Sequence, residues 1–378
     1  MNRTEPVLLE FDPDRHALDK DKKLSDGLSA VVQVGDTLWV ANDEALSLER
    51  LSRQSETTDG AIRFAAHRQF PLHDFLQLPI TPSAEAEAGG KIEEADIEGL
   101  AYGDGYLWLV GSHSLKRRNP DPTDSIEKNR RRLATVRRDG NRFLLARIPL
   151  TEPPCSLERT IARDGRSRTA ARLHGDARGN MLTAALATDA HLGPFLAIPG
   201  KDNGFDIEGL AVAGDRLFIG LRGPVLRGWA VLLEVELEER DASILTLKPI
   251  GLEGRLYRKH FLDLGGLGIR DLCVREADLL ILAGPTLALP GPTTIFRWPG
   301  GARPDREALV SAESLPRVLE LPFGTDQEAG WDQAEGLTLF APGGGEAHQL
   351  LVVYDSTAPR RQREPSIVEA DLFAATEG

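Results

Sequence analysis

One stretch decides the fold: Gly204-Phe205-Asp206-Ile207-Glu208-Gly209-Leu210-Ala211-Val212-Ala213-Gly214-Asp215-Arg216-Leu217-Phe218-Ile219-Gly220. It holds two short apolar runs separated by Gly214-Asp215. A glycine beside an aspartate between two apolar runs is typical of the tight turn of a β-hairpin, because both residues tolerate turn geometry. The stretch therefore predicts a turn, a first strand, a hairpin and a second strand.

Versions of this unit recur along the chain, and we anchor them at Ser29, Glu98, Glu208, Arg270 and Glu335. The intervals between the anchors are 69, 110, 62 and 65 residues. A period of this size with several strands per repeat predicts a β-propeller, in which sheets that cannot bury both faces alone pack around a channel. Five copies predict five blades, and the long second interval leaves six as the alternative. An open β-sandwich assembly is the competing architecture.

The whole chain, residues 1–378, is interpreted as a single all-β propeller domain. The period of two is lost after Thr151, and residues 180–187 have the pattern of a helix. We therefore expect a helical or loop insertion over residues 151–203. The strand near Val7 is expected to pair with a C-terminal strand at 366–373 and close the ring.

The amino-acid composition limits the kinds of molecule that the protein is expected to bind. The formal charge of −13 argues against a nucleic acid or an anionic membrane, because both repel a negative surface. Two cysteines, Cys155 and Cys273, make neither a disulfide framework nor a metal cluster. The N-terminus lacks the apolar core of a signal peptide, and no apolar run reaches the roughly 18 residues of a membrane span. A cytoplasmic protein is expected.

One segment departs from the acidic balance. Residues 116–147 hold 11 basic and 4 acidic side chains. Asp124 and Glu127 have the spacing of a helix start, with Asp124 as N-cap. A solvated loop and helix is the expected structure, and a surface for RNA or an acidic partner is the alternative.

The anchors define the candidate site. In a blade, the start of the inner strand and the end of the next antiparallel strand lie on the same face. The anchors should therefore converge at one mouth of the channel, with His113 beside Glu98 and Arg222 beside Glu208. Because several carboxylates from separate segments suit Ca²⁺, we predict calcium as a cofactor. The predicted metal ligands are Glu98, Asp206, Glu208 and Glu335.

Two kinds of function follow from such a mouth. A bound cation could polarise a phosphoryl or lactone oxygen, with His113 and Glu208 as the candidate catalytic residues of a metal-dependent hydrolase. In the other interpretation the carboxylates accept backbone hydrogen bonds or pair with arginines, and the protein is a non-enzymatic platform for protein partners. Whether the chain is an enzyme stays open at this point.

An anionic small molecule is a further candidate ligand. The predicted binding residues are Lys201, Asn203, Arg222 and Arg270. The planar guanidinium of Arg222 suits a carboxylate or phosphate, but it would equally pair with Glu208.

Three phrases of the sequence resemble the bacterial family called domain of unknown function 3616. They are Pro199-Gly200-Lys201-Asp202-Asn203-Gly204, Phe205-Asp206-Ile207-Glu208-Gly209-Leu210 and Gly220-Leu221-Arg222-Gly223-Pro224-Val225-Leu226-Arg227-Gly228-Trp229-Ala230. The resemblance implies a propeller-like protein and no established activity. It extends distantly to phytase-like propellers, which use calcium and acidic residues on phosphate esters. Ser29 and Arg270 stand at two anchors where that comparison would place acids.

Overall fold

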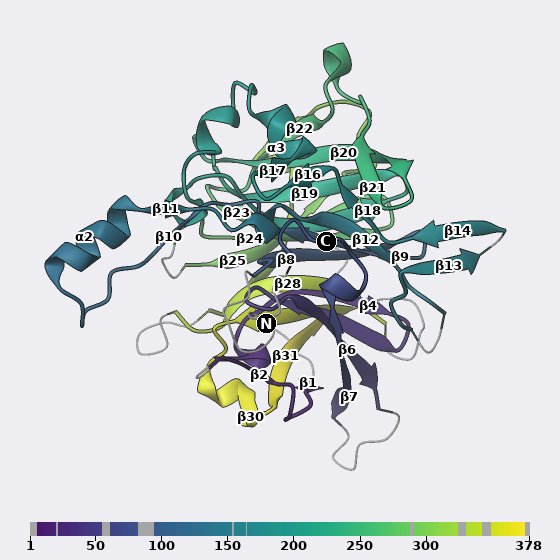
Figure 1. Cartoon of the computed structure of the whole chain (residues 1–378), viewed down its shortest axis with the longest axis vertical. Helices are drawn as coiled ribbons and strands as arrows, with labels where there is room; N and C mark the ends of the chain where they lie inside the picture. The colour runs from purple at the N-terminus through teal and green to yellow at the C-terminus, as the bar shows by residue number, and fades with distance from the viewer. Residues whose placement is uncertain are drawn as a thin grey trace.

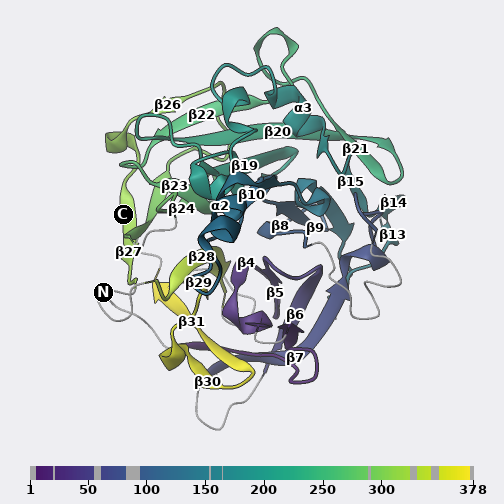
Figure 2. The same ribbon diagram turned by 60° about the vertical axis from the view of Figure 1, so that its left-hand side comes forward.

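The computed structural model describes residues 6–19, 22–54, 61–81, 94–152, 155–163, 165–287, 291–323, 330–341 and 349–374. Within them the chain is an all-β structure of short, mostly antiparallel strands with few helices (Figure 1). Most strands assemble in groups of four that are arranged around a centre (Figure 2). The predicted fold class, an all-β propeller-type architecture, is confirmed at this level.

The groups follow one another along the chain. The first is β4 (Leu28–Val34), β5 (Thr37–Asn42), β6 (Ser47–Arg53) and β7 (Ile62–Pro71); the second is β8 (Ile97–Gly103), β9 (Tyr106–Gly111), β12 (Leu145–Pro149) and β15 (Ala171–Leu173). The third is β18 (Asp206–Ala213), β19 (Arg216–Gly223), β20 (Trp229–Asp241) and β22 (Arg258–Asp263); the fourth is β23 (Gly268–Arg275), β24 (Asp278–Gly284), β25 (Thr293–Trp298) and β27 (Arg317–Leu321). The last is β28 (Gln333–Phe340), β29 (Gln349–Asp355), β31 (Ile367–Ala374) and β1 (Val7–Glu10).

Shorter strands and helices lie between or beside these groups. The short strands are β2 (Ala17–Asp19), β3 (Lys22–Lys23), β10 (Lys116–Arg117), β11 (Val136–Arg137), β13 (Thr160–Arg163), β14 (Arg166–Thr169), β16 (Gly175–Asp176), β17 (Gly179–Asn180), β21 (Ile244–Leu247), β26 (Leu309–Val310) and β30 (Gln362–Glu364). The α-helices among the described residues are α2 (Ile126–Ala134) and α3 (Met181–Leu186). No helix in the described part of the chain is long and apolar enough to cross a membrane.

The stretch that opened the sequence analysis forms β18 and β19. The two strands pair antiparallel up to Ala213 and Arg216, which leaves Gly214-Asp215 as the turn. Gly214 has a φ of 65°, in the left-handed region that glycine adopts without strain. The predicted hairpin is confirmed.

The glycine that follows each glutamate anchor is required by packing between groups. A Cβ at Gly99 of β8 would lie 2.8 Å from Cβ of Leu210 on β18. At Gly336 of β28 it would lie 3.1 Å from the backbone nitrogen of Val31 on β4. The inner strands approach too closely there for a side chain, and they contact one another in the order β4, β8, β18, β23, β28 and back to β4.

The chain ends close the structure as expected. β1 pairs antiparallel with β31, so that Val7 lies opposite Ala370, and parallel with β7 of the first group. The N-terminal strand therefore joins the last group to the first. This pairing satisfies backbone groups that a free sheet edge would expose.

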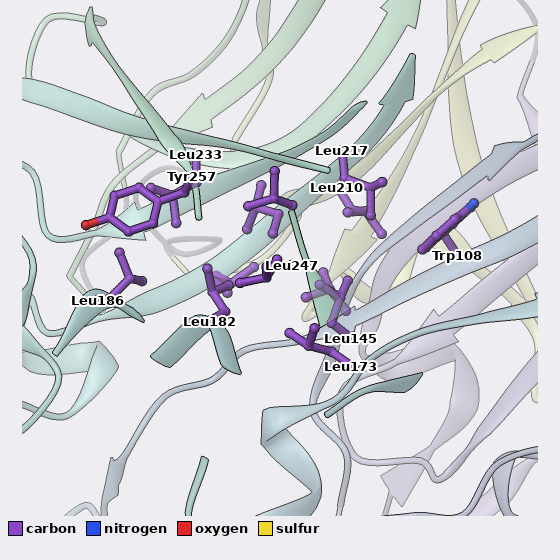
Figure 3. Packing of buried hydrophobic residues seen from close by; sticks show 14 of the residues in the cluster. Trp108, Leu145, Leu173, Leu182, Leu186, Leu210, Leu217, Leu233, Leu247 and Tyr257 are labelled. Carbon is purple, nitrogen blue, oxygen red and sulfur yellow. The ribbon is translucent and has the colours of Figure 1, made fainter. Parts of the chain in front are cut away.

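Residues 151–203 are only partly the insertion that we predicted. The helix is present as α3, and Asn180 caps it by accepting hydrogen bonds from the backbone of Leu182 and Thr183. Leu182 and Leu186 are buried in one apolar cluster with Leu247 and Tyr257 (Figure 3). However, β15 is the fourth strand of the second group. A strand of three residues is too short to show a period of two, which is why the sequence pattern missed it.

Candidate site at the channel mouth

All five anchors occupy the same kind of position, the extra residue of a β-bulge near the start of an inner strand. In β8, for example, Ile97 pairs with Gly111 and Gly99 with Val110, so Glu98 has no partner across the strand. The corresponding breaks in register leave out Ser29, Glu208, Arg270 and Glu335. A bulge re-aims the side chain of its extra residue. The repeat therefore presents a polar side chain from every inner strand at the same level.

A cavity of about 240 Å³ lies at this level. Nine carboxylic acid side chains line it: Asp43, Glu44, Glu94, Asp96, Glu98, Asp206, Glu208, Glu335 and Asp355. Five basic side chains also line it: Lys116, Arg117, Arg142, Lys201 and Arg222. The structure thus brings the four predicted metal ligands, together with Lys201 and Arg222, to one acidic hollow.

Arg222, at the end of β19, is a buried bridge between two carboxylates. Its Nη2 lies 2.6 Å from Oδ2 of Asp206, and its Nη1 lies 2.5 Å from Oε1 of Glu208. Arg222 is 8% exposed and Glu208 is 3% exposed. Because both ends of the guanidinium are engaged, Arg222 has no free fork for an anionic ligand. The alternative pairing with Glu208 is the observed one.

Arg270 joins the two neighbouring anchors. It pairs through Nη1 with Glu335, and its Nε lies 3.4 Å from Oε2 of Glu208. That Oε2 atom is buried and has no hydrogen-bond partner among the described residues, because the contact with Arg270 lacks hydrogen-bonding geometry. Arg270 is thus a cation placed between two carboxylates of the ring. Ser29 is structural, since its hydroxyl donates to the carbonyl of Ile97 on the next inner strand at 2.6 Å.

Glu98 differs from the other glutamate anchors. It lines the cavity, but within the described residues it has neither an ion pair nor a hydrogen bond. Burial, followed by the charges of Asp96 and Glu208, raises the pKa of Glu98 well above its ordinary value. Burial and the charge of Asp355 similarly raise the pKa of Glu335 to about 7. The mouth therefore holds carboxyl groups that are poorly compensated by its arginines.

Sequence reasoning missed several residues of the site, among them Asp43 and Arg142. Asp43 follows β5, 14 residues after Ser29, as Arg222 follows Glu208 by 14. Aligning the ends of the second strands would have found Asp43, whose pKa is raised well above its ordinary value by burial and by Asp96. Arg142 had no such signal, because it comes from the 3-10 turn Gly140–Phe143 and reaches Asp96 at 2.7 Å.

Two predicted anion-binding residues, Lys201 and Asn203, lie near one another, but only Lys201 lines the cavity. Lys201 lines the cavity, is exposed and has no ion pair within the described part of the chain. Asn203 does not line the cavity. It adopts a left-handed conformation, φ 61°, and its side-chain oxygen accepts a hydrogen bond from the backbone of Val225. Asn203 therefore shapes the turn before β18.

The structure places His113 away from the mouth. It lines a separate hollow with Asn180 and Phe143. Its Nδ1 lies 2.7 Å from the carbonyl oxygen of Gly111, and its Nε2 lies 2.6 Å from the amide nitrogen of Asn180. Burial lowers the pKa of His113 to about 4. The expected position of His113 as a base beside Glu98 is corrected: the bulge turns Glu98 to the cavity, while His113 is a satisfied, neutral, buried histidine.

Calcium fits this arrangement poorly. Asp206, Glu208 and Glu335 are already paired with arginines, and an arginine beside a carboxylate competes with a metal ion for it. In the described residues no group of three or more histidine, cysteine, aspartate or glutamate side chains is placed to hold a metal ion. Both cysteines are free.

Fold and site together define a propeller-type protein. Its acidic cavity is lined in part by glutamates that lie at β-bulges of the inner strands. The chain belongs to the family described as protein of unknown function (DUF3616), whose model matches residues 27–371. The predicted family is thus confirmed over most of the chain. No curated protein matches the sequence.

Solved structures resemble the chain only at low similarity. Glutaminyl cyclase of Myxococcus xanthus has 12% identity and a TM-score of 0.37, with 99% of this chain and 100% of that chain covered. The PQQ-bound aldose sugar dehydrogenase of Streptomyces coelicolor has 12% identity and a TM-score of 0.33, with 93% and 97% covered. A putative oxidoreductase (glucose dehydrogenase) of Thermus thermophilus has 14% identity and a TM-score of 0.37, with 92% and 97% covered.

Proposed function

We propose that the chain is a five-bladed propeller whose channel mouth binds a small organic cation, such as an amine or a guanidinium group. The cyclic contacts of five inner strands support the blade count. Glu98 is the observation that carries the binding function, because it is a cavity-lining carboxyl group without a cationic partner in the described residues. A ligand that supplies the missing positive charge would complete the site.

The electrostatics of the cavity favour a cation over an anion. Nine carboxyl groups face five basic groups, and Arg270 behind them adds only one more positive charge. A protonated amine would bring several N–H donors to the carboxyl group of Glu98. Charge-assisted hydrogen bonds of this kind are strong where water is excluded.

The residues of the cavity support a binding function better than a hydrolytic one. No histidine is among the described residues of the cavity, and Glu208 is held between two arginines. A calcium-dependent hydrolase of a phosphate ester or lactone remains a prediction, and a parallel titration with CaCl₂ tests whether the site binds calcium. Lys201 lines the cavity and has no ion pair with any described residue, so it could contact an acidic group on the ligand's outer end.

The test is a titration with defined probes. Putrescine is expected to raise the melting temperature of the protein and to bind in calorimetry, whereas the Glu98→Gln variant should bind at least about tenfold more weakly. Because the pKa of Glu98 is raised, an amine that binds the carboxylate form should displace a proton. The binding heat should then depend on the ionisation enthalpy of the buffer.

The control variant is Glu238→Gln, which removes an exposed carboxylate outside the cavity and should bind putrescine as the wild type does. Equal affinity in Glu98→Gln and in the wild type would contradict the proposal. CaCl₂ replaces putrescine in a parallel titration. Binding of Ca²⁺ that is lost in Asp206→Asn, without binding of putrescine, would favour the calcium prediction instead.

A further inference from the structure

A basic segment, here called the arm, begins at residues that line the cavity. It consists of residues 116–138, with β10 and β11 paired at its base and α2 at its tip. Lys116 and Arg117 at the base line the cavity. Figure 1 shows α2 standing away from the sheets at the edge of the molecule. The arm thus begins at the acidic mouth and projects from it.

The arm is held by its own contacts. Ser125, rather than the predicted Asp124, is the N-cap of α2 and accepts a hydrogen bond from the backbone of Lys128. Asp124 instead pairs with Lys128 and Arg132. At the base, Arg117 pairs with Asp202 at 2.9 Å. These contacts fix the arm's position without packing α2 onto the sheets.

No residue of α2 is buried. Ile126 is 80% exposed, Leu133 is 47% exposed and Val136, just after the helix, is 41% exposed. A nine-residue helix gains most of its stability in proteins from packing an apolar face against something. Within the described part of the chain these three apolar side chains therefore keep 41–80% of their surface exposed.

The arm and the rest of the chain have opposite charge. Residues 116–138 hold 9 basic and 3 acidic side chains, a net charge of +6. The chain has 45 basic and 58 acidic residues, so the remainder holds 36 and 55, a net charge of −19. Exposed arginines without an ion pair in the described residues lie on the arm: Arg118, Arg130, Arg131, Arg137 and Arg138.

We propose that the arm docks at the acidic channel mouth of a second copy of this chain, around a two-fold axis. The same face of the molecule carries the basic arm and the acidic mouth, so it is complementary to itself. A two-fold contact places each arm against the other copy's mouth and closes the assembly as a dimer. A long polyanion such as RNA lying along the arm would meet the cavity's carboxylates at the base, which disfavours it.

In the dimer, arginine guanidinium groups of one copy face carboxylates of the other, and Ile126 and Leu133 leave water at the contact. Association driven by exposed charges weakens with ionic strength. Formation of this dimer does not require the proposed ligand.

Sedimentation velocity of the full chain tests the proposal. The wild type should be a dimer in about 50 mM NaCl and should dissociate toward monomer in about 500 mM NaCl. The variant Arg130→Glu/Arg131→Glu should weaken dimerisation at least about 100-fold in low salt. Its melting temperature should stay close to that of the wild type, because neither side chain is buried.

The matched control is Arg303→Glu/Arg306→Glu, which reverses two exposed arginines away from the arm and leaves the dimer intact. A wild type that stays monomeric in low salt would overturn the proposal. Species that keep growing in size with concentration would also overturn it, and so would equal effects of the two double variants on dimerisation. Binding of an RNA oligonucleotide to a monomeric wild type would replace the proposal with the nucleic-acid alternative. Putrescine binding by the monomeric arm variant would show that the ligand site stands independently of the dimer.

Discussion

Replacing Arg222 by glutamine is expected to lower the free energy of unfolding by about 3–5 kcal/mol at about pH 8. The substitution leaves Asp206 and Glu208 buried without the cation that bridges them. Breaking a buried ion pair is costly because the remaining charge is neither hydrated nor neutralised. Urea denaturation of the wild type and the variant measures the difference.

The pH dependence of this loss separates electrostatics from packing. Burial already raises the pKa values of Asp206 and Glu208, and losing Arg222 removes the largest opposing charge. At about pH 5 both carboxyl groups of the variant should take up protons, so the loss should be smaller there. The control Arg306→Gln, at an exposed site, should change stability by less than about 0.5 kcal/mol. A loss for Arg222→Gln that is independent of pH would contradict the electrostatic explanation.

The variant Glu335→Gln is expected to be more stable than the wild type by about 3 kcal/mol at about pH 8 and equal to it near pH 4.5. Burial and Asp355 raise the pKa of Glu335 from 4.5 to about 7. Between these values the folded wild type keeps a proton that the unfolded chain has lost. Its free energy of unfolding therefore falls as the pH rises through this window, whereas glutamine has no proton to lose.

The comparison must be made between variants, because His113 has the opposite effect. Burial lowers the pKa of His113 from 6.5 to about 4, so its contribution to stability is lost as the pH falls through that range. The two groups offset each other in the pH profile of the wild type. Relative to the wild type, the free energy of unfolding of the variant His113→Gln should accordingly be highest at low pH. Parallel pH profiles for Glu335→Gln and the wild type would show that Glu335 does not titrate as the structure implies.

The strands and their order were predictable because the signal is local and repeated. The Gly-Asp turn of residues 214–215 and its counterparts mark hairpins by backbone geometry alone. Repetition at similar intervals then indicates that the copies pack alike. The outer strand β15 was not predictable in this way, since its three residues are placed by pairing with β12 and β21 from distant parts of the chain.

The sequence by itself determined that Glu98, Glu208 and Glu335 occupy equivalent places, and that a glycine follows each of them. It did so because a repeated backbone geometry needs the same residue type at the same position. Only the tertiary structure decided what these glutamates do. Arg222 and Arg270 pair with Glu208 and Glu335, Arg142 from a distant turn pairs with Asp96, and Glu98 alone of the three glutamates has no cation among the described residues. Charge compensation depends on distances across neighbouring groups of strands, which no local pattern records.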